Sequence, residues 1–283
     1  SLADRLPPIT RRVIWVEGAS PRPLRALWWL PCGAFFLRAF VPSWLLSHST
    51  IDDQNLPRRC RESTISPMTS TRDSVVVVTG GGRGIGRAIC QRFAADGAQV
   101  VAAARTLAEL EETRRVVEQA GGQCHVQPTD VCVPDEIDSL IETTAGRFGR
   151  IDVLVNCAGI APQAAIEELE PALFTTIMAV NVIAVYYACR SVWPVMKKQK
   201  SGVIVNISSI ASVDPFAGFA AYGAAKAWVN TWTKALADEG RRLGIRVFSV
   251  APGAVETRML RDSFPTFPVD QTLRPEDVAD VVF

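Results

Sequence analysis

Tyr222 and Lys226 are spaced so that they could carry out acid–base chemistry together. They stand at positions i and i+4 of a stretch that predicts a helix beginning at Ala221, so the phenol and the ammonium would project from one face. A free tyrosine has a pKa of about 10, which is too high for easy proton exchange near neutral pH. Because a neighbouring cation favours the phenolate, we expect Lys226 to lower the pKa of Tyr222.

Two serines end the predicted strand just upstream of this pair. Ser208 closes the strand and Ser209 follows it, thirteen residues before Tyr222. A serine hydroxyl at such a place can donate a hydrogen bond to a substrate oxygen on which charge develops. A Tyr-x-x-x-Lys spacing alone is weak evidence, because in many helices the tyrosine packs in the core and the lysine is solvated. The interpretation therefore needs support from the rest of the chain.

That support begins with a glycine-rich loop, TGGGRGIG at 79–86, between the predicted strand Val75–Thr79 and a helix beginning at Arg83. A dinucleotide pyrophosphate must come close to backbone N–H groups at a helix N-terminus, and only glycine leaves room for that approach. A tight structural turn would need one or two glycines rather than five. The strand–loop–helix context makes this a strong indication of dinucleotide binding.

The T-G-x-x-x-G-x-G spacing resembles that of the short-chain dehydrogenase/reductase family, and the resemblance extends over residues 75–283. It rests on an ordered series: the glycine loop, N-C-A-G at 156–159, Asn181, Ser209, Tyr222, Lys226 and P-G-x-x-x-T at 252–257. The resemblance implies hydride transfer between nicotinamide C4 and a carbonyl or carbinol carbon, while Tyr222 gives or takes a proton. It also selects Ser209 over Ser208, and it implies that Asn181 holds a water that relays protons to Lys226.

The same resemblance implies which residues meet the cofactor. Lys226 would also reach the nicotinamide ribose, Thr257 the carboxamide and Asp130 the adenine ring. Cys157 replaces the second asparagine of the usual N-N-A-G and so removes one side-chain donor beside the site. The expected catalytic residues are Asn181, Ser209, Tyr222 and Lys226, and no metal is required. The expected cofactor-binding residues are Gly80, Arg83, Gly84, Ile85, Gly86, Arg105, Asp130, Val131, Asn156, Ala158, Gly159, Tyr222, Lys226, Pro252, Gly253 and Thr257.

The end of the second predicted strand bears on the choice between NAD and NADP. An acid there would accept from the ribose 2′-hydroxyl, whereas this strand ends in Ala-Ala and Arg105, and we place the nearest acid, Glu109, one turn into the next helix. A guanidinium can form paired hydrogen bonds with a 2′-phosphate, and Arg83 supplies a second one in the glycine loop. Either arginine alone could be a solvated loop residue. The two together favour NADP(H) and the NADP-preferring members of the family, including the 3-oxoacyl-carrier-protein reductases.

Short β-branched runs alternate with amphipathic helical stretches from Val75 onward, which predicts an α/β fold. We expect a Rossmann-like, doubly wound parallel sheet. Its six strands are expected at Val75–Thr79, Gln99–Ala103, Cys124–Pro128, Ile151–Asn156, Val203–Ser208 and Ile245–Val250. Relatives continue through a further helix and a seventh strand, so residues 68–283 are interpreted as one NADP-binding domain that lacks the seventh strand at its C-terminus.

Residues 1–67 have a different composition, rich in arginine, tryptophan and proline, and Met68 is the first methionine. The stretch Ala26–Leu46 is apolar, but a charge such as Arg38 near its centre would cost about 3 kcal/mol on membrane insertion. We interpret residues 1–67 as an upstream extension without a folded role. A targeting or membrane-anchoring segment is the alternative.

Composition excludes several other classes of function. Lysine and arginine number 30 against 29 acidic residues, so no overall basic field would attract nucleic acid. Seven cysteines without a C-x-x-C pair argue against a disulfide framework and against structural zinc, and they fit a cytoplasmic protein. The two histidines, His48 and His125, fit no catalytic triad.

The substrate is less constrained by these motifs. Segments 160–163, 210–219 and 259–267 are expected to line its pocket. Their apolar residues are Ile160, Val213, Phe216, Phe219, Met259, Phe264 and Phe267, and their main charges are Asp214, Arg258, Arg261 and Asp262. This set favours an apolar or aromatic ketone or alcohol over a small polyol.

Three further expectations concern partners and activity. A basic set, Lys197, Lys198, Lys200, Arg241 and Arg242, could dock an acyl carrier protein or could simply be a solvated helix end. Trp228 and Trp232 lie beside small residues on the Tyr222 helix, which favours a homodimer or homotetramer over tryptophans that only cover the sheet. A second class of function is an NADP-binding fragment or regulatory protein that catalyses nothing.

Overall fold

The computed structural model describes residues 13–18, 25–28 and 71–283, which are arranged around one sheet of strand order β2-β1-β8-β7-β6-β3-β4-β5. Six strands are parallel: β3 (Val75–Thr79), β4 (Gln99–Ala104), β5 (Gln123–Pro128), β6 (Val153–Asn156), β7 (Gly202–Ile207) and β8 (Ile245–Pro252). The predicted α/β fold with six parallel strands is confirmed for this part of the chain. The predicted strand bounds differ from the observed ones by two residues at most.

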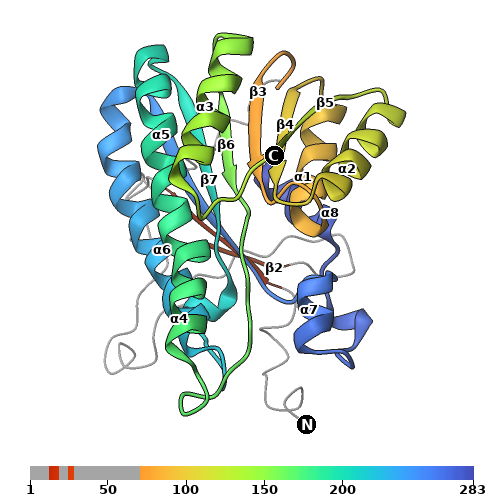
Figure 1. Ribbon diagram of the computed structural model, residues 1–283, viewed down its shortest axis with the longest axis vertical. Helices are drawn as coiled ribbons and strands as arrows, with labels where there is room; N and C mark the ends of the chain where they lie inside the picture. Colours follow the sequence, from red (N-terminus) through yellow and green to blue (C-terminus); the bar gives the residue numbers. More distant parts are fainter. Residues whose placement is uncertain (1–12, 19–24, 29–70) are drawn as a thin grey trace, which may run out of the picture.

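Helices cover both faces of the parallel strands (Figure 1). One face carries α1 (Gly84–Ala95), α2 (Leu107–Gln119) and α8 (Pro275–Val282), and the other carries α3 (Pro134–Phe148), α5 (Ala184–Gln199) and α6 (Ala220–Gly240). A π-helical turn, Ala179–Ile183, joins α4 (Pro171–Met178) to α5, and α7 (Arg258–Ser263) follows β8. Because both faces are covered, a central strand such as β3 is buried at every position, which explains its unbroken run of valines.

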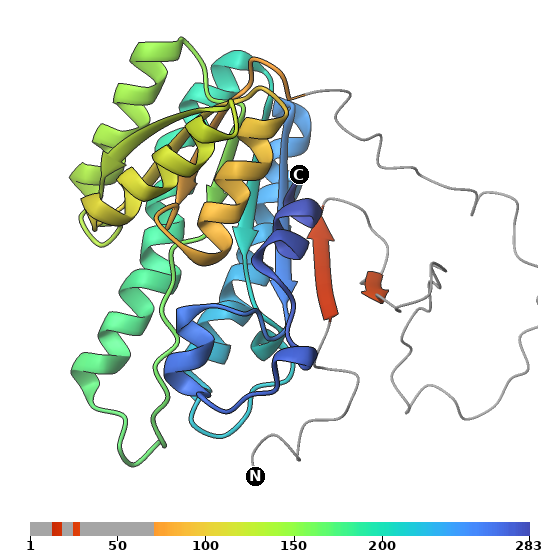
Figure 2. The same cartoon turned by 90° about the vertical axis from the view of Figure 1, so that its right-hand side faces the viewer.

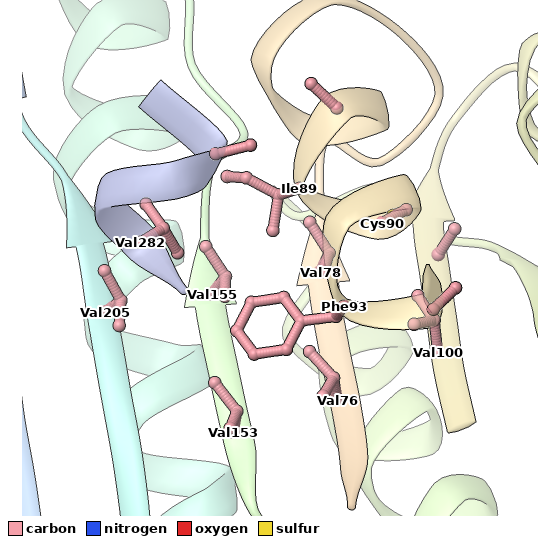
Figure 3. Close-up of a cluster of buried hydrophobic side chains, with 14 of the residues drawn as sticks. Val76, Val78, Ile89, Cys90, Phe93, Val100, Val153, Val155, Val205 and Val282 are labelled. Carbon is pink, nitrogen blue, oxygen red and sulfur yellow. The ribbon is translucent and has the colours of Figure 1, made fainter. Parts of the chain in front are cut away.

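The core between the sheet and α1 is filled by branched side chains and one aromatic ring. Valines of β3 and β6 surround Phe93 of α1, and Val282 of α8 lies across the same cluster (Figure 3). The ring of Phe283 meets Phe93 edge-on with the centroids 5.3 Å apart, and the guanidinium carbon of Arg92 lies 3.4 Å from the Phe283 centroid. Helix α8 is therefore an integral part of this core.

Two strands from the N-terminal segment extend the sheet beyond β8. Strand β1 (Val13–Gly18) pairs antiparallel with β8, and β2 (Arg25–Trp28) pairs antiparallel with β1 (Figure 2). The prediction that residues 1–67 have no folded role is wrong for these two strands. The physical reason is the free side of β8, whose backbone N–H and C=O groups offer a ready template for another strand. The rest of 1–67, including most of the apolar stretch Ala26–Leu46, lies outside the described residues.

One helical stretch, Pro171–Gln199, is long and apolar enough to cross a membrane by length and composition, with a mean hydropathy of 1.8. Core helices of proteins that never enter a membrane pass the same test. This stretch packs Val185, Ala188 and Val192 against the sheet, so its apolar character is explained by the core.

The carboxyl ends of the parallel strands meet at one edge of the sheet, where the strand order reverses between β3 and β6. In open α/β sheets, ligands bind outside such a switch point. The glycine loop follows β3 there, N-C-A-G follows β6, Ser209 lies just beyond β7 and P-G-x-x-x-T begins at the end of β8. The topology therefore gathers motifs that are far apart in the sequence.

Removal of residues 1–67 should destabilise the protein, because it takes β1 and β2 away and leaves one side of β8 unpaired. We expect the midpoint of thermal unfolding to fall by about 5 °C, which corresponds to the loss of roughly 1–3 kcal/mol in a domain of this size. The free edge should also promote association as concentration rises. Scanning calorimetry and light scattering measure the two effects.

The matched control is a chain that begins at Val13 and so keeps both strands. It should unfold at the temperature of the full chain. Equal stability of the full chain and of a chain that begins at Met68 would show that the β1–β8 pairing contributes nothing.

Candidate functional site

Ser209, Tyr222 and Lys226 come together in a cavity of about 530 Å³ at the carboxyl edge of the sheet. Ser209 follows β7 and caps a short 3₁₀ turn, where its hydroxyl accepts from the Ala211 N–H at 3.2 Å. Tyr222 and Lys226 lie in the first two turns of α6 and face the same space, as their spacing predicts. The cavity is also lined by expected cofactor-binding residues, namely Ile85, Gly159, Pro252, Gly253 and Thr257.

The structure separates the roles of the two serines. Ser208 is 2% exposed, and its hydroxyl donates to the backbone carbonyl of Lys226 at 3.1 Å. This bond ties the end of β7 to α6 and occupies the proton of Ser208. Ser209 instead lines the cavity together with Tyr222, and its hydroxyl acts to lower the pKa of the phenol. The choice of Ser209 as the catalytic serine stays a prediction.

Lys226 is a buried cation whose side chain has no carboxylate partner in the part of the chain that the structure describes. It is 4% exposed, and its Nζ donates to the carbonyl of Ile207 at 2.8 Å. Loss of hydration disfavours the ammonium and lowers its pKa to about 8. The lysine is therefore close to its titration point at physiological pH.

The expectation that Lys226 lowers the pKa of Tyr222 is wrong for this structure. Burial raises the pKa of the phenol, and the nearby Ser209 hydroxyl opposes that effect without overcoming it. The Lys226 Nζ lies 5.7 Å from the centre of the tyrosine ring and is directed to the Ile207 carbonyl. Desolvation therefore outweighs the charge of the lysine, and Tyr222 holds its proton at neutral pH.

Asn181 lies in the π-helical turn between α4 and α5, where a wider turn changes the direction of a side chain. Its Nδ2 donates to the carbonyls of Ile160 and Ile177 at 2.9 and 3.0 Å, and its Oδ1 accepts from the Ile160 N–H at 3.3 Å. A Cβ on Gly159 would lie 3.0 Å from Asn181 Oδ1 and 3.6 Å from Lys226 Nζ. Asn181 thus stands behind Gly159, close to the lysine, and holds the segment after β6. Its expected role in holding a water stays a prediction.

The glycine loop packs on itself so closely that side chains are excluded. Gly80 and Gly84 have φ values of 70° and 52°, and a Cβ on Gly86 would lie 2.1 Å from the Gly80 carbonyl oxygen. Helix α1 begins at Gly84 with neither a side-chain cap nor an acidic residue in its first turn. Its first N–H groups and its positive dipole end therefore fit a pyrophosphate.

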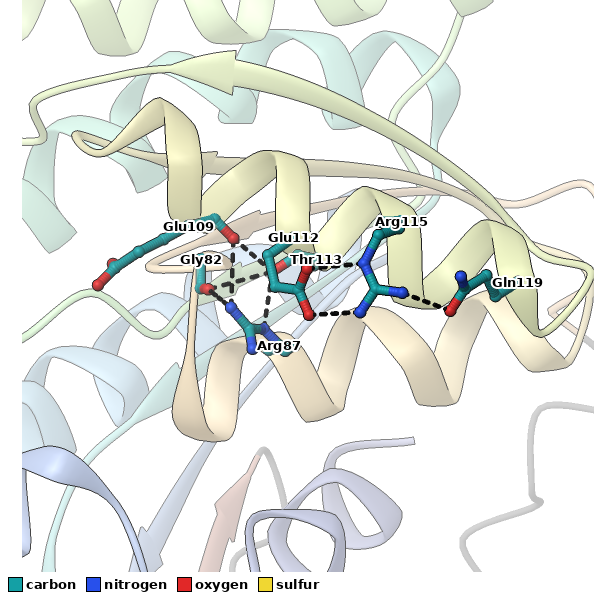
Figure 4. A network of polar contacts seen from close by, with 7 residues as sticks. All are labelled: Gly82, Arg87, Glu109, Glu112, Thr113, Arg115 and Gln119. Carbon is teal, nitrogen blue, oxygen red and sulfur yellow. Dashed lines mark hydrogen bonds and ion pairs between the residues drawn. The ribbon is translucent and has the colours of Figure 1, made fainter.

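A polar network that includes Arg87 and Thr113 holds the loop from behind (Figure 4). The Arg87 Nη2 donates to the Gly82 carbonyl at 2.6 Å, and the Arg87 Nε donates to Thr113 Oγ1 at 3.1 Å. Thr113 Oγ1 in turn lies 2.9 Å from the Gly81 carbonyl oxygen. These contacts engage the loop carbonyls, which supports an arrangement that presents N–H groups to an anion.

The remaining residues expected to bind the cofactor also form hydrogen bonds that hold the surrounding protein in place. Asn156 is 3% exposed and donates to Asn206 Oδ1 at 2.8 Å, while the N–H groups of Cys157 and Ala158 donate to Thr79 Oγ1 at 3.2 and 3.3 Å. Asp130 Oδ1 accepts from the Cys132 N–H at 2.9 Å, and the neighbouring Val131 is buried. Burial raises the pKa of Cys157 to about 12, so the residue that replaces asparagine is a neutral thiol.

The two arginines expected to bind a 2′-phosphate have different surroundings. Arg105 is exposed and pairs with no carboxylate among the described residues. Arg83 pairs with Glu109 at 3.3 Å, and Arg258 from α7 approaches the same carboxylate oxygen at 3.4 Å. Glu109 was expected one turn into its helix, but it is the third residue of α2. It lies close to the glycine loop, because a Cβ added to Gly82 would be 3.1 Å from the Cβ of Glu109. The sequence identifies Glu109 as the nearest acid but does not reveal these two ion pairs, because the partners come from the glycine loop and from α7.

The part of the cavity beyond Tyr222 has an aromatic wall. Of the residues expected to line it, the structure places Asp214, Phe216, Phe219, Met259, Phe264 and Phe267 there. Ile160 and Val213 are not among the lining residues, and Val213 is 55% exposed. Arg258 and Arg261 also do not line the cavity, because each guanidinium is engaged by a glutamate. The substrate end of the site is therefore more apolar than its sequence indicates.

Two sets of residues lie apart from the cavity. Lys197, Lys198, Lys200, Arg241 and Arg242 precede β7 and β8, so they lie at the amino edge of the sheet, opposite the site. That position disfavours their use in docking an acyl carrier protein at this cavity.

The Trp228 and Trp232 rings stack with their centroids 5.1 Å apart, and Tyr186 of α5 meets Trp232 edge-on. Subunit contact through α6 stays a prediction. No group of metal ligands occurs within the described ranges.

Fold and site together define a dinucleotide-dependent oxidoreductase of the Rossmann type. A model of the family described as short chain dehydrogenase matches residues 74–267, and the chain belongs to that family. A curated relative, an uncharacterised oxidoreductase of Staphylococcus saprophyticus, is 39% identical over 194 residues, which are 68% of this chain and 78% of the relative.

Solved structures agree with this assignment. A metagenomic short-chain oxidoreductase in complex with NADP is 36% identical, with a TM-score of 0.67 and coverage of 75% of this chain and 90% of the other. A 3-ketoacyl-(acyl-carrier-protein) reductase from Brucella melitensis complexed with NADH is 32% identical, with a TM-score of 0.68 and the same coverage. The predicted family is therefore confirmed.

Replacement of Lys226 by methionine should stabilise the protein at neutral pH. The folded state lowers the lysine pKa from 10.5 to about 8, so below pH 8 both states are protonated and folding carries the full cost of burying the charge. From pH 8 to 10.5 the unfolded chain binds more protons, and the stability of the parent protein rises. We expect a gain of about 1–3 kcal/mol for Lys226→Met at pH 7 that shrinks toward pH 10.

Denaturant unfolding at pH 7 and pH 10 measures this difference. Thr233→Val, which also removes a buried polar group from α6 but does not titrate, is the control and should show no pH-dependent change. A Lys226→Met gain that is the same at both pH values would mean that folding does not lower the pKa of the lysine.

Proposed function

We propose that this protein is an NADP(H)-dependent oxidoreductase that interconverts a carbonyl compound and a secondary alcohol by hydride transfer, with Ser209, Tyr222, Lys226 and Asn181 as its catalytic set. The observation that carries the proposal is the convergence of a serine hydroxyl, a phenol and a buried ammonium in one cavity that also reaches the glycine loop. A Tyr-x-x-x-Lys pair that served only packing would not share a cavity with a dinucleotide cradle.

The chain's own residues account for the proton chemistry, while the bound cofactor supplies the hydride. Tyr222 keeps its proton at neutral pH because burial raises its pKa, which suits donation to a carbonyl oxygen during reduction. Ser209 can donate to the same oxygen as negative charge grows on it. The Lys226 ammonium, bonded to the Ile207 carbonyl, contributes positive charge to the closed end of the cavity. These protonation states are the ones that reduction of a carbonyl requires at its acid.

The preference for NADP(H) over NAD(H) is supported by charge. Arg105 is exposed and free of carboxylates in the described part of the chain, at the end of β4 where a 2′-phosphate would come. Against it stands Glu109, which holds Arg83 and Arg258. Among the solved relatives, one was crystallised with NADP and another with NADH, so the local charges of this chain carry the proposal. The residues that would hold the phosphate are Arg105 and, once released by Glu109, Arg83.

Replacement of Tyr222 by phenylalanine tests the mechanism. The change removes one oxygen, so ring packing against Phe219 and affinity for NADPH should persist. Reduction of an aromatic ketone or α-diketone should slow by at least a hundredfold, in line with the roughly 10²–10⁴ that a positioned acid contributes. Steady-state kinetics and NADPH fluorescence titration measure the two quantities. Turnover at the parental rate would overturn the mechanism, and binding without turnover in the parent would favour a non-catalytic NADP-binding protein.

Replacement of Glu109 by glutamine tests the choice of cofactor. The change removes a negative charge beside the expected phosphate site and releases two guanidinium groups. We expect NADPH to bind about three- to tenfold more tightly while NADH changes little, because only NADPH carries the additional phosphate. Arg105→Asp should have the opposite effect and should favour NADH. Dissociation constants from titration decide, and parallel changes for both cofactors would count against a 2′-phosphate site here.

A further inference from the structure

Three phenylalanine rings form one wall of the substrate end of the cavity. Phe219 and Phe264 stack with centroids 5.7 Å apart and an interplanar angle of 17°. Phe216 approaches both of them, at 4.7 Å from Phe219 and 5.7 Å from Phe264. Phe219 in turn meets Tyr222 edge-on at 5.9 Å. The wall therefore begins beside the proton donor, and aromatic rings attract a cation that reaches their faces.

The two arginines of α7 are each paired with a glutamate. The Arg261 guanidinium forms a two-pronged ion pair with the Glu256 carboxylate and also donates to the Phe267 carbonyl at 2.6 Å. Arg258 is directed to Glu109, beside the glycine loop. Although both arginines belong to α7, neither lines the cavity. The positive charges expected here from the sequence are thus absent from the substrate end.

One carboxylate remains. Asp214 and Lys226 are the charged residues among those lining the cavity. Lys226 lies at the closed end, bonded to the Ile207 carbonyl, whereas Asp214 is exposed and lies on the segment between Ser209 and Phe216. The Asp214 carboxylate has no hydrogen bond or ion pair within the described ranges, and only its backbone N–H is engaged, by the Ile210 carbonyl. An unpaired carboxylate therefore stands next to an aromatic wall.

We propose that the substrate of this site is an aromatic or alicyclic ketone, or the corresponding alcohol, that carries a cationic amine, and that Asp214 with the phenylalanine wall recognises the ammonium group. This inference rests on the proposed oxidoreductase function and names its substrate class. The carbonyl is held by Ser209 and Tyr222 at the inner end, and the ammonium lies toward Asp214 at the outer end.

The charges of the cavity support this class over its competitors. An ammonium is attracted both by a carboxylate and by the face of an aromatic ring, and both attractions strengthen where water is partly excluded. A substrate with a carboxylate or phosphate at the same place would be repelled by Asp214, and among the described residues that line the cavity there is no arginine to compensate. A neutral ketone fits the wall but gains no attraction from Asp214, whose exposed carboxylate stays hydrated. The cationic ketone is the one class that satisfies both features.

Three ketones of similar shape test the proposal: 4-(aminomethyl)acetophenone, 4-ethylacetophenone and 4-acetylbenzoate. Calorimetric titration in the presence of NADP⁺, which cannot reduce a ketone, measures binding without turnover. We expect the ammonium compound to bind about tenfold more tightly than the ethyl compound, and the carboxylate compound to bind more weakly than either. The preference should shrink as ionic strength rises, because the pair is partly exposed to solvent.

Asp214→Asn should abolish most of the preference for the ammonium compound. The matched control is Asp262→Asn, which removes the same charge from an exposed α7 residue that does not line the cavity, and it should keep the preference. Equal affinity of the parent protein for the ammonium and ethyl compounds would overturn the proposal. So would a preference that survives Asp214→Asn.

Turnover distinguishes failure of this proposal from failure of the proposed function. If NADPH reduces 4-ethylacetophenone and the ammonium compound has no advantage in binding, the protein is an oxidoreductase and the substrate class is wrong. If the ammonium compound binds with the expected preference and no ketone is reduced, the recognition site stands and the catalytic function is wrong.

Discussion

The site depends on one interaction, the bond from the buried Lys226 ammonium to the carbonyl of Ile207. A charge taken out of water needs either a counter-ion or enough hydrogen bonds, and here the described residues supply a backbone carbonyl but no carboxylate. The nearby Cys157 does not substitute for one, since burial keeps its thiol neutral. The lysine is therefore held in place at a cost in stability, and its remaining donors face the cavity that the proposed cofactor and substrate would share.

A chain of buried polar groups fixes the elements that carry this lysine. Asn156 at the end of β6 donates to Asn206 of β7, and Asn206 donates to Thr233 of α6 at 2.9 Å. Ser208 completes the attachment by donating to the Lys226 carbonyl. Each group in the chain is satisfied by the next, and a fully satisfied network of this kind specifies one relative position of its elements. The strand end and the helix that bear Ser209, Tyr222 and Lys226 are thus locked together.

The sequence was sufficient for the features that local chemistry determines. Uninterrupted valines predicted β3, five glycines between a strand and a helix predicted the phosphate cradle, and the Ser209, Tyr222 and Lys226 spacing predicted a shared cavity. It failed where distant segments meet. The pairing of β1 with β8 depends on a sheet edge that exists only in the assembled sheet. The ion pairs of Glu109 bring together α2, the glycine loop that carries Arg83 and the helix α7 that carries Arg258. The raised pKa of Tyr222 depends on burial, which spacing alone does not reveal.

The distribution of charge around the cavity also depends on contacts between segments that are distant in the sequence. Two glutamates, Glu109 and Glu256, engage the arginines of α7, and each reaches them from outside that helix. A count of charges along the sequence therefore misjudges the field inside the site, because paired charges largely cancel at a distance while unpaired ones do not. What remains is a cation at the inner end and a carboxylate at the outer end of an aromatic-walled cavity. A field of that form would orient the proposed substrate with its electron-rich carbonyl oxygen inward and its positive group outward, so the proposed selection of substrate and its orientation for proton transfer would have one physical origin.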